Sequence, residues 1–237
     1  MKIRIKFSKY GTMKYIGHLD MMRFFQKAIR RAGIDVKYSE GFSPHQIMSF
    51  AAPLGIGVES QGEYMDIEVC SMAGTQDMKE ALARVMVEGV EIISMSVLPD
   101  NAKNAMASVA AASYLLQRKE GDYPVDDLAG KLQAFLAQKT IPYTKETKKS
   151  VVELDLKEGI YELSADGSNA IRMMVNASSS GNIKPGMVME AFCSFIGVEI
   201  PAGSYQVIKL ETYTELAHKF VPLDSIGCVA DAFMNDG

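Results

Sequence analysis

Cysteine is scarce in this sequence. Only three cysteines, Cys70, Cys193 and Cys228, occur in 237 residues, and they lie far apart. They form no CxxC pair, no zinc-ligand pattern and no disulfide framework. Because an iron–sulfur cluster needs three or four local thiolates, the chain cannot hold one by itself. We expect each cysteine to be a small buried side chain rather than a ligand, and we predict no metal and no cofactor.

Long hydrophobic runs are also absent. No apolar run reaches the ~18–20 residues that cross a bilayer. Residues 2–7 alternate basic and apolar side chains, whereas a signal peptide needs a continuous apolar segment. The hydrophobic content of 48% and the charged content of 23% are ordinary for a globular protein. We therefore expect a cytoplasmic protein that does not contact a membrane.

Acidic side chains are rare in the first fifty residues. Residues 1–50 contain ten Lys and Arg but three Asp and Glu, which gives a net charge of +7. Residues 51–237 contain 15 basic and 26 acidic side chains, which gives a net charge of −11. This asymmetry predicts that the N-terminal part attracts phosphate or an acidic protein. It does not specify a reaction.

Hydrophobic periodicity predicts a β-α-β-β-α-β order in the first hundred residues. A period of two indicates strands and a period of 3.6 indicates helices. The expected elements lie at 2–8, 19–32, 36–39, 63–70, 77–87 and 90–98. This order folds most simply as an antiparallel four-stranded sheet with both helices on one face. The other face of the sheet would stay open for a ligand or for RNA.

The same order recurs in the second half, with one extra hairpin strand. The expected elements lie at 107–117, 125–138, 149–156, 159–165, 171–177, 187–196 and 205–213. We therefore predict an α+β fold of two tandem ferredoxin-like (βαββαβ) units with antiparallel sheets. The N-terminal domain with the basic segment would cover 1–100 and the C-terminal domain 105–214. Residues 215–237 would form a C-terminal tail.

The predicted helix at 19–32 carries four basic residues opposite its apolar stripe. They are Arg23, Lys27, Arg30 and Arg31. One interpretation is a ridge that follows the phosphates of RNA. The alternative is an ordinary solvated helix face, in which Arg30 and Arg31 favour the helix dipole.

Two basic residues of the first strand, Arg4 and Lys6, would face the open side of the sheet. They are candidates for binding RNA or a partner. The third strand would present Tyr64, Asp66 and Glu68 on the same face. Cross-strand ion pairs are therefore the competing interpretation, and we favour it for these strand residues.

The loop at 39–49 concentrates unusual residue types, since glycine and proline fix its backbone path. Its candidate binding residues are Gly41, Phe42, Ser43, Pro44 and His45. His18 lies just before the basic helix. His18 and His45 together would suit metal-independent RNA cleavage by general acid–base chemistry. The alternative is that His18 caps a helix and His45 bonds a backbone carbonyl.

A Gly/Ser-rich loop at 178–186 leads into the predicted helix at 187–196. A loop of this kind at a helix start is a possible anion site, and Pro185 suits a first helical turn. The loop matches neither the P-loop nor the GxGxxG spacing. A plain polar linker is the alternative.

Several short segments of residues 1–70 together resemble the radical-SAM-linked protein family. They are Ile3-Arg4-Ile5-Lys6-Phe7-Ser8-Lys9, Ile16-Gly17-His18-Leu19-Asp20, Tyr38-Ser39-Glu40-Gly41-Phe42-Ser43-Pro44-His45, Gly55-Ile56-Gly57-Val58-Glu59-Ser60 and Glu63-Tyr64. That family is an uncharacterised bacterial domain found beside, or fused to, a radical SAM enzyme. The resemblance implies a radical SAM enzyme as partner. Since this chain has no CxxxCxxC triad, the iron–sulfur cofactor would belong to that partner.

The tandem layout is also similar to CRISPR RNA-processing endonucleases of the RAMP class. Their glycine-rich motif near the C-terminus is not recognisable here, so the similarity concerns the fold and does not transfer the activity.

These observations lead to one expected function and two alternatives. We expect a radical SAM-associated accessory protein, without catalytic activity of its own, that binds RNA or a related anionic substrate for its partner enzyme. One alternative is a metal-independent endoribonuclease of RAMP-like fold that uses His18 and His45. The other is a protein–protein adaptor that binds no nucleic acid.

Overall fold

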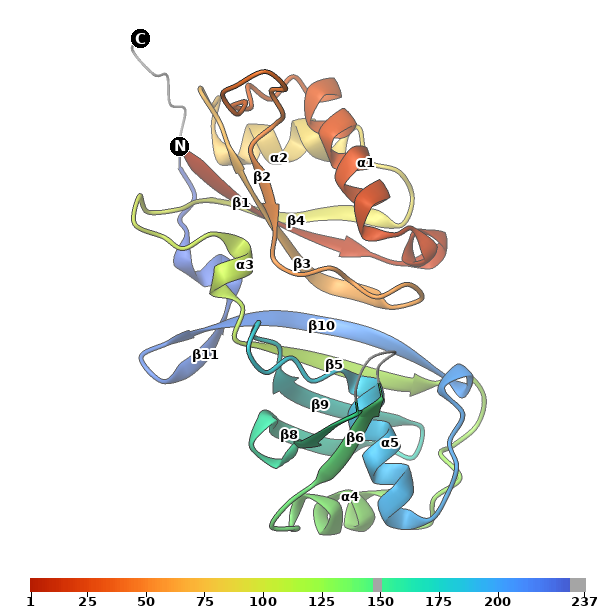
Figure 1. The fold of residues 1–237 in the computed structure, drawn as a ribbon. Coiled ribbons are helices and arrows are strands. Elements are labelled where there is room, and N and C mark those ends of the chain that lie inside the picture. The colour runs from red at the N-terminus through yellow and green to blue at the C-terminus, as the bar shows by residue number, and fades with distance from the viewer. Residues whose placement is uncertain (147–150, 231–237) are drawn as a thin grey trace. The chain divides into compact units, whose positions relative to one another are not determined.

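A computed structural model describes residues 1–146 and 151–230. The fold is α+β, and the described residues form five α-helices and a mixed nine-stranded sheet (Figure 1). The chain divides into two compact units. The first combines Met1–Val109 with the chain from Glu211 onward, and the second is Ala110–Leu210. No helix of the described part has both the length and the apolar character needed to span a membrane.

The first unit contains a β-α-β-β-α-β series, as the periodicity predicted. Its elements are β1 (Lys2–Lys9), α1 (His18–Arg31), β2 (Met48–Phe50), β3 (Glu59–Glu68), α2 (Thr75–Ala83) and β4 (Val90–Val97). Strand β1 lies between β4 and β3, and β2 pairs with β3. All of these pairings are antiparallel.

Short elements complete the first unit. They are η1 (Gly11–Tyr15), α3 (Ala105–Ser108), the end of β10 (Tyr205–Leu216), β11 (Lys219–Pro222) and η4 (Leu223–Ile226). Strand β11 pairs with β10 in an antiparallel hairpin.

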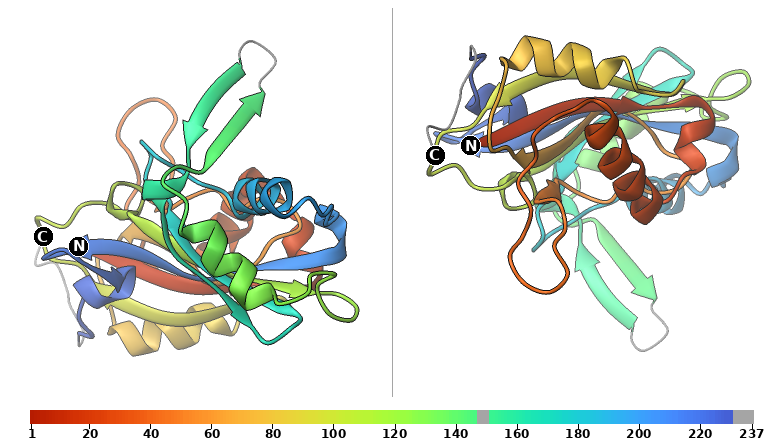
Figure 2. Two further views of the ribbon diagram at one scale, coloured as in Figure 1. Left: turned by 90° about the horizontal axis from the view of Figure 1, so that it is seen from below. Right: turned by 90° about the horizontal axis from the view of Figure 1, so that it is seen from above.

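The core of the first unit follows from alternation in β1. Ile3, Ile5 and Phe7 are buried and pack with Phe25 and Ile29 of α1. Helix α2 contributes to the same core, so α1 and α2 cover one face of the sheet (Figure 2). Burial of large aliphatic and aromatic side chains stabilises this arrangement by roughly 1.5–3 kcal/mol for each side chain.

The predicted strand at 36–39 is wrong. Val36 and Tyr38 form isolated bridges, to Val69 and Gln46 respectively, and the second strand lies instead at Met48–Phe50. The chain turns back on itself after Tyr38, so only the later segment runs along β3. The predicted helix at 77–87 is shifted, since α2 begins at Thr75 and ends at Ala83.

The C-terminal segment covers part of the sheet face that was expected to be open. Leu223 at the start of η4 is fully buried, and its carbonyl accepts a hydrogen bond from Arg4. Cys228 pairs with Val97 through two backbone hydrogen bonds. The predicted tail, residues 215–237, therefore contains β11 and η4, and η4 covers the side of β1 that bears Arg4. Residues 231–237 of that tail lie outside the described residues.

The second unit repeats the β-α-β-β-α-β series with an added hairpin. Its elements are β5 (Ala111–Arg118), α4 (Leu128–Leu136), β6 (Pro142–Glu146), β7 (Val151–Asp155), η2 (Lys157–Gly159), β8 (Ile160–Asp166), β9 (Ala170–Asn176), α5 (Pro185–Ile196), η3 (Ala202–Ser204) and the start of β10. Strand β9 pairs antiparallel with β5 and with β8. Strands β6 and β7 form a separate two-stranded hairpin (Figure 2).

Candidate functional site

Arg4 is a structural residue and not an accessible binding residue. Its side chain is 1% exposed. Its Nε and Nη2 donate to Asp66 at 2.8 and 2.9 Å, Nη1 donates to the Leu223 carbonyl, and Nη2 also donates to the Lys103 carbonyl. The cross-strand ion pair predicted from the register is thereby confirmed. The proposed contact of Arg4 with RNA must be corrected, because its donors are used inside the fold.

Lys6 is likewise held by carboxylates. Its amine donates to Glu211 and lies 3.7 Å from Asp224. The Tyr64 hydroxyl lies 2.8 Å from Glu211 Oε1 and 3.1 Å from Asp224 Oδ1, and Ser94 donates to Asp224 at 3.0 Å. Burial raises the pKa of Tyr64, and the nearby carboxylates raise it further. This network connects η4 and β10 with β1, β3 and β4. Because the amine of Lys6 is already paired there, Lys6 is also a poor candidate for RNA binding.

The basic face of α1 is exposed, in contrast to β1. Arg23, Lys27, Arg30 and Arg31 all reach solvent. Arg23 pairs with Asp20 at 3.2 Å, but both side chains are exposed and such pairs contribute little. Within the described part of the chain, Lys27 and Arg30 have no ion-pair partner. These cations are therefore available to an anionic ligand.

Residues 38–46 form a closed loop, here called the 38–46 hairpin. Ser39 N donates to the His45 carbonyl at 2.8 Å, and His45 N donates to Ser39 Oγ at 3.1 Å. The ring nitrogen His45 Nδ1 lies 2.9 Å from the same hydroxyl. Gly41 adopts φ +108°, a conformation that other residues rarely adopt. The five loop candidates, residues 41–45, are all exposed.

The 38–46 hairpin is anchored on α1. Gln46 Nε2 donates to the backbone carbonyl of Gln26 at 3.2 Å, and Gln46 is buried. On a helix, residues three or four apart are surface neighbours. Gln26 therefore has Arg23 on one side and Arg30 on the other. The structure thus ties the base of the loop to the basic helix, the two features predicted from the sequence (Figure 1).

The two histidines belong to different features. His18 is the first residue of α1, and its ring meets the ring of Phe50 edge-on at 5.3 Å. Helix α1 has Gly17 at its N-cap and no side-chain cap, so the expectation that His18 caps a helix is wrong. His45 lies in the exposed hairpin. The pocket that His18 lines does not include His45, so no described contact favours a joint catalytic pair.

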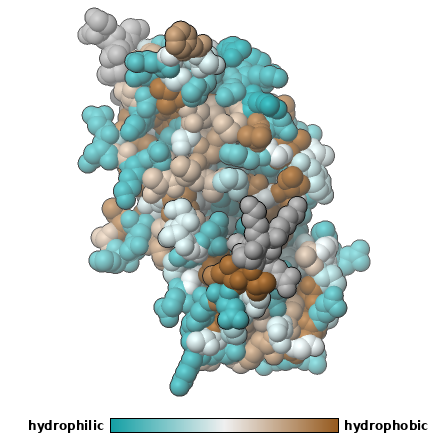
Figure 3. Space-filling view, in the orientation of Figure 1, coloured by the Kyte–Doolittle hydropathy of each residue, from teal (hydrophilic) through white to brown (hydrophobic). Residues whose placement is uncertain are grey.

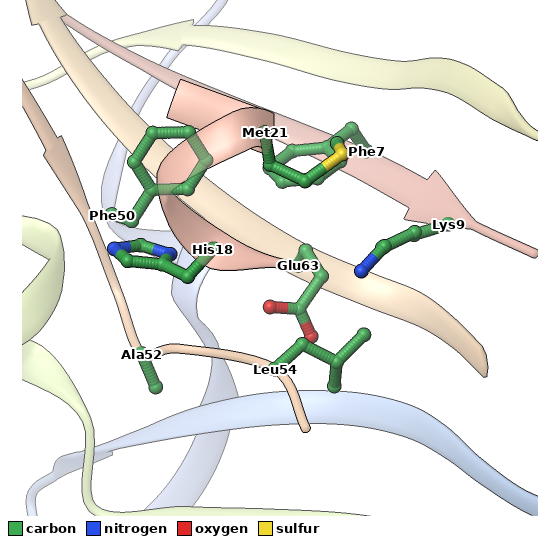
Figure 4. Close-up of a pocket in the computed structure, with 8 residues that line it drawn as sticks. All are labelled: Phe7, Lys9, His18, Met21, Phe50, Ala52, Leu54 and Glu63. Carbon is green, nitrogen blue, oxygen red and sulfur yellow. The ribbon is translucent and has the colours of Figure 1, made fainter. Parts of the chain in front are cut away.

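A small pocket lies at the start of α1 (Figure 4). It is lined by Phe7, Lys9, His18, Met21, Phe50, Ala52, Leu54 and Glu63. Its cavity volume is ≈ 20 Å³, which is room for little more than a water molecule. Lys9 and Glu63 are 2% and 3% exposed, so two ionisable groups meet in an apolar interior.

Hydrogen bonds hold both ionisable groups of the pocket. The Lys9 amine donates to the Ile16 carbonyl at 2.6 Å, and Ser60 Oγ donates to Glu63 at 2.8 Å. Burial lowers the pKa of Lys9, and the nearby Glu63 partly offsets this effect. The sequence reasoning missed both residues. Every second residue of β1 from Ile3 onward faces the core, and Lys9 is the next in this series. The alternation along the strand could therefore have predicted that Lys9 is buried.

Three large apolar side chains are exposed near this pocket. Tyr15, Leu19 and Ile56 are 63%, 67% and 71% exposed. The Gly57 N–H donates to the Lys14 carbonyl at 2.9 Å, which brings the chain beside Ile56 next to Tyr15. On the face drawn in Figure 3, hydrophobic side chains form separate patches among hydrophilic ones. We call these three residues the apolar end of the first unit.

The cysteines are less buried than expected. Cys70 and Cys228 are exposed and Cys193 is half-buried, because Cys70 follows the end of β3 and Cys228 follows η4 rather than facing a core. Burial raises the pKa of the Cys193 thiol. Among residues 1–146 and 151–230, no three His, Cys, Asp or Glu side chains are grouped so that they could hold a metal ion.

The Gly/Ser loop of the second unit borders a pocket of ≈ 480 Å³. Pro185 occupies the first turn of α5, as predicted. The carboxylates of Asp155 and Glu158 are among the lining side chains, and they disfavour an anion. The Asn176 side chain accepts hydrogen bonds from the backbone and hydroxyl of Ser178, which accounts for the loop conformation.

Comparison with known proteins identifies a family. No curated protein matches the chain. Residues 2–185 match a bacterial family described as "Uncharacterized protein conserved in bacteria (DUF2344)". The match includes the whole of α1, the 38–46 hairpin and the pocket, and it covers well over half of the sequence. The protein therefore belongs to the DUF2344 family of uncharacterized conserved bacterial proteins.

Proposed function

We propose that this protein is a non-catalytic accessory protein that binds RNA for a partner radical SAM enzyme. The RNA would lie on the exposed face of α1 and the adjoining 38–46 hairpin. The observation that carries this proposal is the hydrogen bond from Gln46 to the Gln26 carbonyl, since it ties the base of the hairpin to the helix that carries the exposed cations.

Electrostatics supports this location for RNA. Lys27 and Arg30 project into solvent, and the Arg23–Asp20 pair is exposed enough to open at little cost. Lysine and arginine side chains along a helix neutralise phosphates and release counterions. By contrast, Arg4 and Lys6 are already neutralised inside the fold. Among the basic residues proposed to bind RNA, those with accessible charge therefore lie on α1 and not on β1.

The strand order supports the interpretation of two tandem ferredoxin-like units. The first unit has the order β4-β1-β3 with β2 beside β3, and the second has β10-β5-β9-β8. Each series is β-α-β-β-α-β apart from the added hairpin of the second unit. Many RNA-binding modules are built on a sheet with helices on one face, including RAMP-like proteins. A shared fold does not establish a shared function, so the proposal depends on the surface of α1.

The RNA-binding proposal has a direct experimental test. Fluorescence anisotropy would measure the affinity of the protein for labelled tRNA and rRNA fragments at two salt concentrations. We expect the double variant Lys27→Glu/Arg30→Glu to bind at least about tenfold more weakly, with a salt slope reduced by about one for each lost phosphate contact. Lys139→Glu in the second unit changes the net charge by the same amount per site and serves as the control.

Two results would contradict the RNA-binding proposal. One is no measurable binding at low salt. The other is an equal loss of affinity in Lys139→Glu, since the loss would then follow from the net charge of the protein and not from the position of the cations on α1.

The apolar end of the first unit favours a second candidate function, that of a protein adaptor. Tyr15, Leu19 and Ile56 present large apolar surfaces, and the nearby charge of Lys14 is paired with Glu59 at 2.9 Å. A neutral patch of this kind suits a protein partner better than RNA. The resemblance to the radical-SAM-linked family supports a radical SAM enzyme as that partner.

The adaptor function is tested by co-purification with the radical SAM enzyme. Leu19→Asp/Ile56→Asp would lose the partner and keep the RNA affinity if the apolar end is the protein interface. Retention of the partner by this variant would exclude the apolar end as that interface. If the variant instead keeps the partner and loses RNA affinity, the apolar end binds RNA and not the partner protein.

A further inference from the structure

Phe42 at the tip of the 38–46 hairpin has no structural reason to be aromatic. Its side chain is 112% exposed, which means that it is as open to water as in an extended peptide. Among the described large hydrophobic residues, the next most exposed are Val229 at 78% and Ile56 at 71%. A ring with this exposure contributes nothing to the core through burial. The Phe42 ring is therefore available to a ligand outside the folded chain.

The hairpin presents this ring from a defined position. Hydrogen bonds between Ser39 and His45 close the loop, and Gln46 ties its base to α1. Gly41 supplies the positive φ that the tip requires, and Pro44 restricts the backbone on the other side. A ring held in place before binding loses less conformational entropy when it makes a contact.

The surroundings of Phe42 differ from those of a protein-docking patch. Its loop neighbours Glu40, Gly41, Ser43 and Pro44 are exposed and are polar, small or cyclic. They provide no continuous apolar surface. The anchored base of the hairpin instead adjoins the basic face of α1. An exposed ring on a loop whose base is tied to a basic helix suits single-stranded nucleic acid, because bases stack on aromatic side chains while cations hold the backbone.

We propose that this surface takes single-stranded RNA, with the Phe42 ring stacked on one unpaired base and Lys27 and Arg30 contacting phosphates. This inference rests on the proposed RNA-binding function of the same surface. Tyr38 at the base of the hairpin is 45% exposed and offers a second ring for a neighbouring base. In a duplex the bases are already stacked and paired, so Phe42 gains no partner there.

The test compares one RNA 12-mer of unstructured sequence with its duplex form in anisotropy titrations. We expect Phe42→Ala to weaken binding of the single strand by about 5-fold to 150-fold, the range for loss of one stacked base, and to leave duplex binding unchanged. The salt slope should stay that of the wild-type protein, because no phosphate contact is removed. Phe42→Tyr should restore the affinity, whereas Phe42→Leu should not. Met106→Ala, which truncates an exposed apolar side chain of the first unit outside the proposed interfaces, is the control.

The outcomes separate this inference from the RNA-binding proposal. If the wild-type protein binds no RNA, the proposed function itself fails. If it binds with the expected salt slope but Phe42→Ala retains full affinity for the single strand, the stacking role is overturned and RNA binding stands. Equal losses on single strand and duplex would also overturn it. Because the ring is exposed, Phe42→Ala should keep the wild-type circular dichroism and melting temperature, which excludes unfolding as the cause of a loss.

Discussion

Basic residues of the first unit occupy two environments with opposite consequences. Arg4 and Lys6 are enclosed by carboxylates and backbone carbonyls, so they stabilise the fold. Lys27 and Arg30 are exposed and unpaired among the described residues. Since removal of a cation has different effects in these environments, stability and RNA binding can be tested by separate substitutions.

Substitution of Arg4 should destabilise the protein strongly. Arg4→Met leaves the Asp66 carboxylate buried without its partner, and we expect the free energy of unfolding to fall by about 3–5 kcal/mol. Urea denaturation followed by circular dichroism measures this change. The double variant Arg4→Met/Asp66→Leu should recover much of the loss, since no unpaired charge remains. A single variant as stable as wild type would show that the ion pair is not required.

Tyr64 should make stability depend on pH in the alkaline range. Its pKa is raised above the ordinary value of 10.0, first by burial and then by Glu211. Above pH 10 the unfolded chain loses the phenolic proton while the folded protein keeps it, so rising pH favours unfolding. Wild type should therefore lose stability more steeply above about pH 10 than Tyr64→Phe does. Parallel pH profiles of the two proteins would contradict the assigned environment of Tyr64.

For single residues, the sequence predicted an ion pair correctly but predicted the burial of several side chains poorly. The Arg4–Asp66 pair followed from strand register and is confirmed. The exposure of Cys70 and the cover over Arg4 did not follow, because both depend on what the C-terminal segment and strand ends do in three dimensions. Lys9 was missed, although its parity in β1 placed it on the buried side.

Helix α1 joins the pocket, the basic face and the hairpin anchor within 14 residues. Its amphipathic period and the following Gly33 made it predictable from the sequence. Its start was less predictable, because Gly17 at the N-cap offers no side chain to bond the first N–H groups. The helix therefore begins without the usual polar signal.

A side-chain cap should stabilise α1. Gly17 has φ −70° and ψ 163°, a conformation open to any residue, and a Cβ atom there would meet nothing within 4 Å. We expect Gly17→Ser to raise the free energy of unfolding by about 0.5–1 kcal/mol, through the cap and through lower entropy of the unfolded chain. Thermal melts would show a higher melting temperature. Gly17→Ala is the comparison variant: it shares the entropic effect, but alanine is a poor N-cap residue, so it should be less stable than Gly17→Ser.

The 38–46 hairpin was only partly predictable from the sequence. The sequence identified it as a loop of unusual residue types but placed a strand at 36–39. Tyr38 bridges Gln46 instead and closes the loop, while Val36 bridges Val69 beyond the end of β3. Its attachment to α1 through Gln46 depends on a single side-chain contact across 20 positions, which local periodicity does not encode.

At the scale of the whole molecule, the first unit is made from both ends of the chain. Residues 1–109 supply α1, α2, α3 and most strands, while the chain from Glu211 onward supplies part of β10, β11 and η4. The β-α-β-β-α-β order was predictable from periodicity. The return of the C-terminus was not, because Lys219–Ile226 is short, contains Pro222 and shows no regular apolar period.

This organisation predicts different behaviour for two fragments. Fragment 110–210 contains the whole core of the second unit, including Phe135 and Phe192, and should unfold cooperatively on heating. Fragment 1–109 lacks Leu223 and Asp224, so Arg4 and Lys6 lose partners and the fragment should not show a cooperative transition. Calorimetry of both fragments measures this. Cooperative unfolding of fragment 1–109 would contradict the structural role of the C-terminal segment.

The salt dependence of RNA affinity tests the central claim most directly. Anisotropy titrations of wild type and Lys27→Glu/Arg30→Glu with one single-stranded RNA, between about 50 and 200 mM salt, give both slopes. We predict that wild-type affinity falls steeply as salt rises and that the variant has weaker binding and a shallower slope. Absence of binding by wild type, or identical slopes for the two proteins, would show that the exposed cations of α1 do not hold RNA.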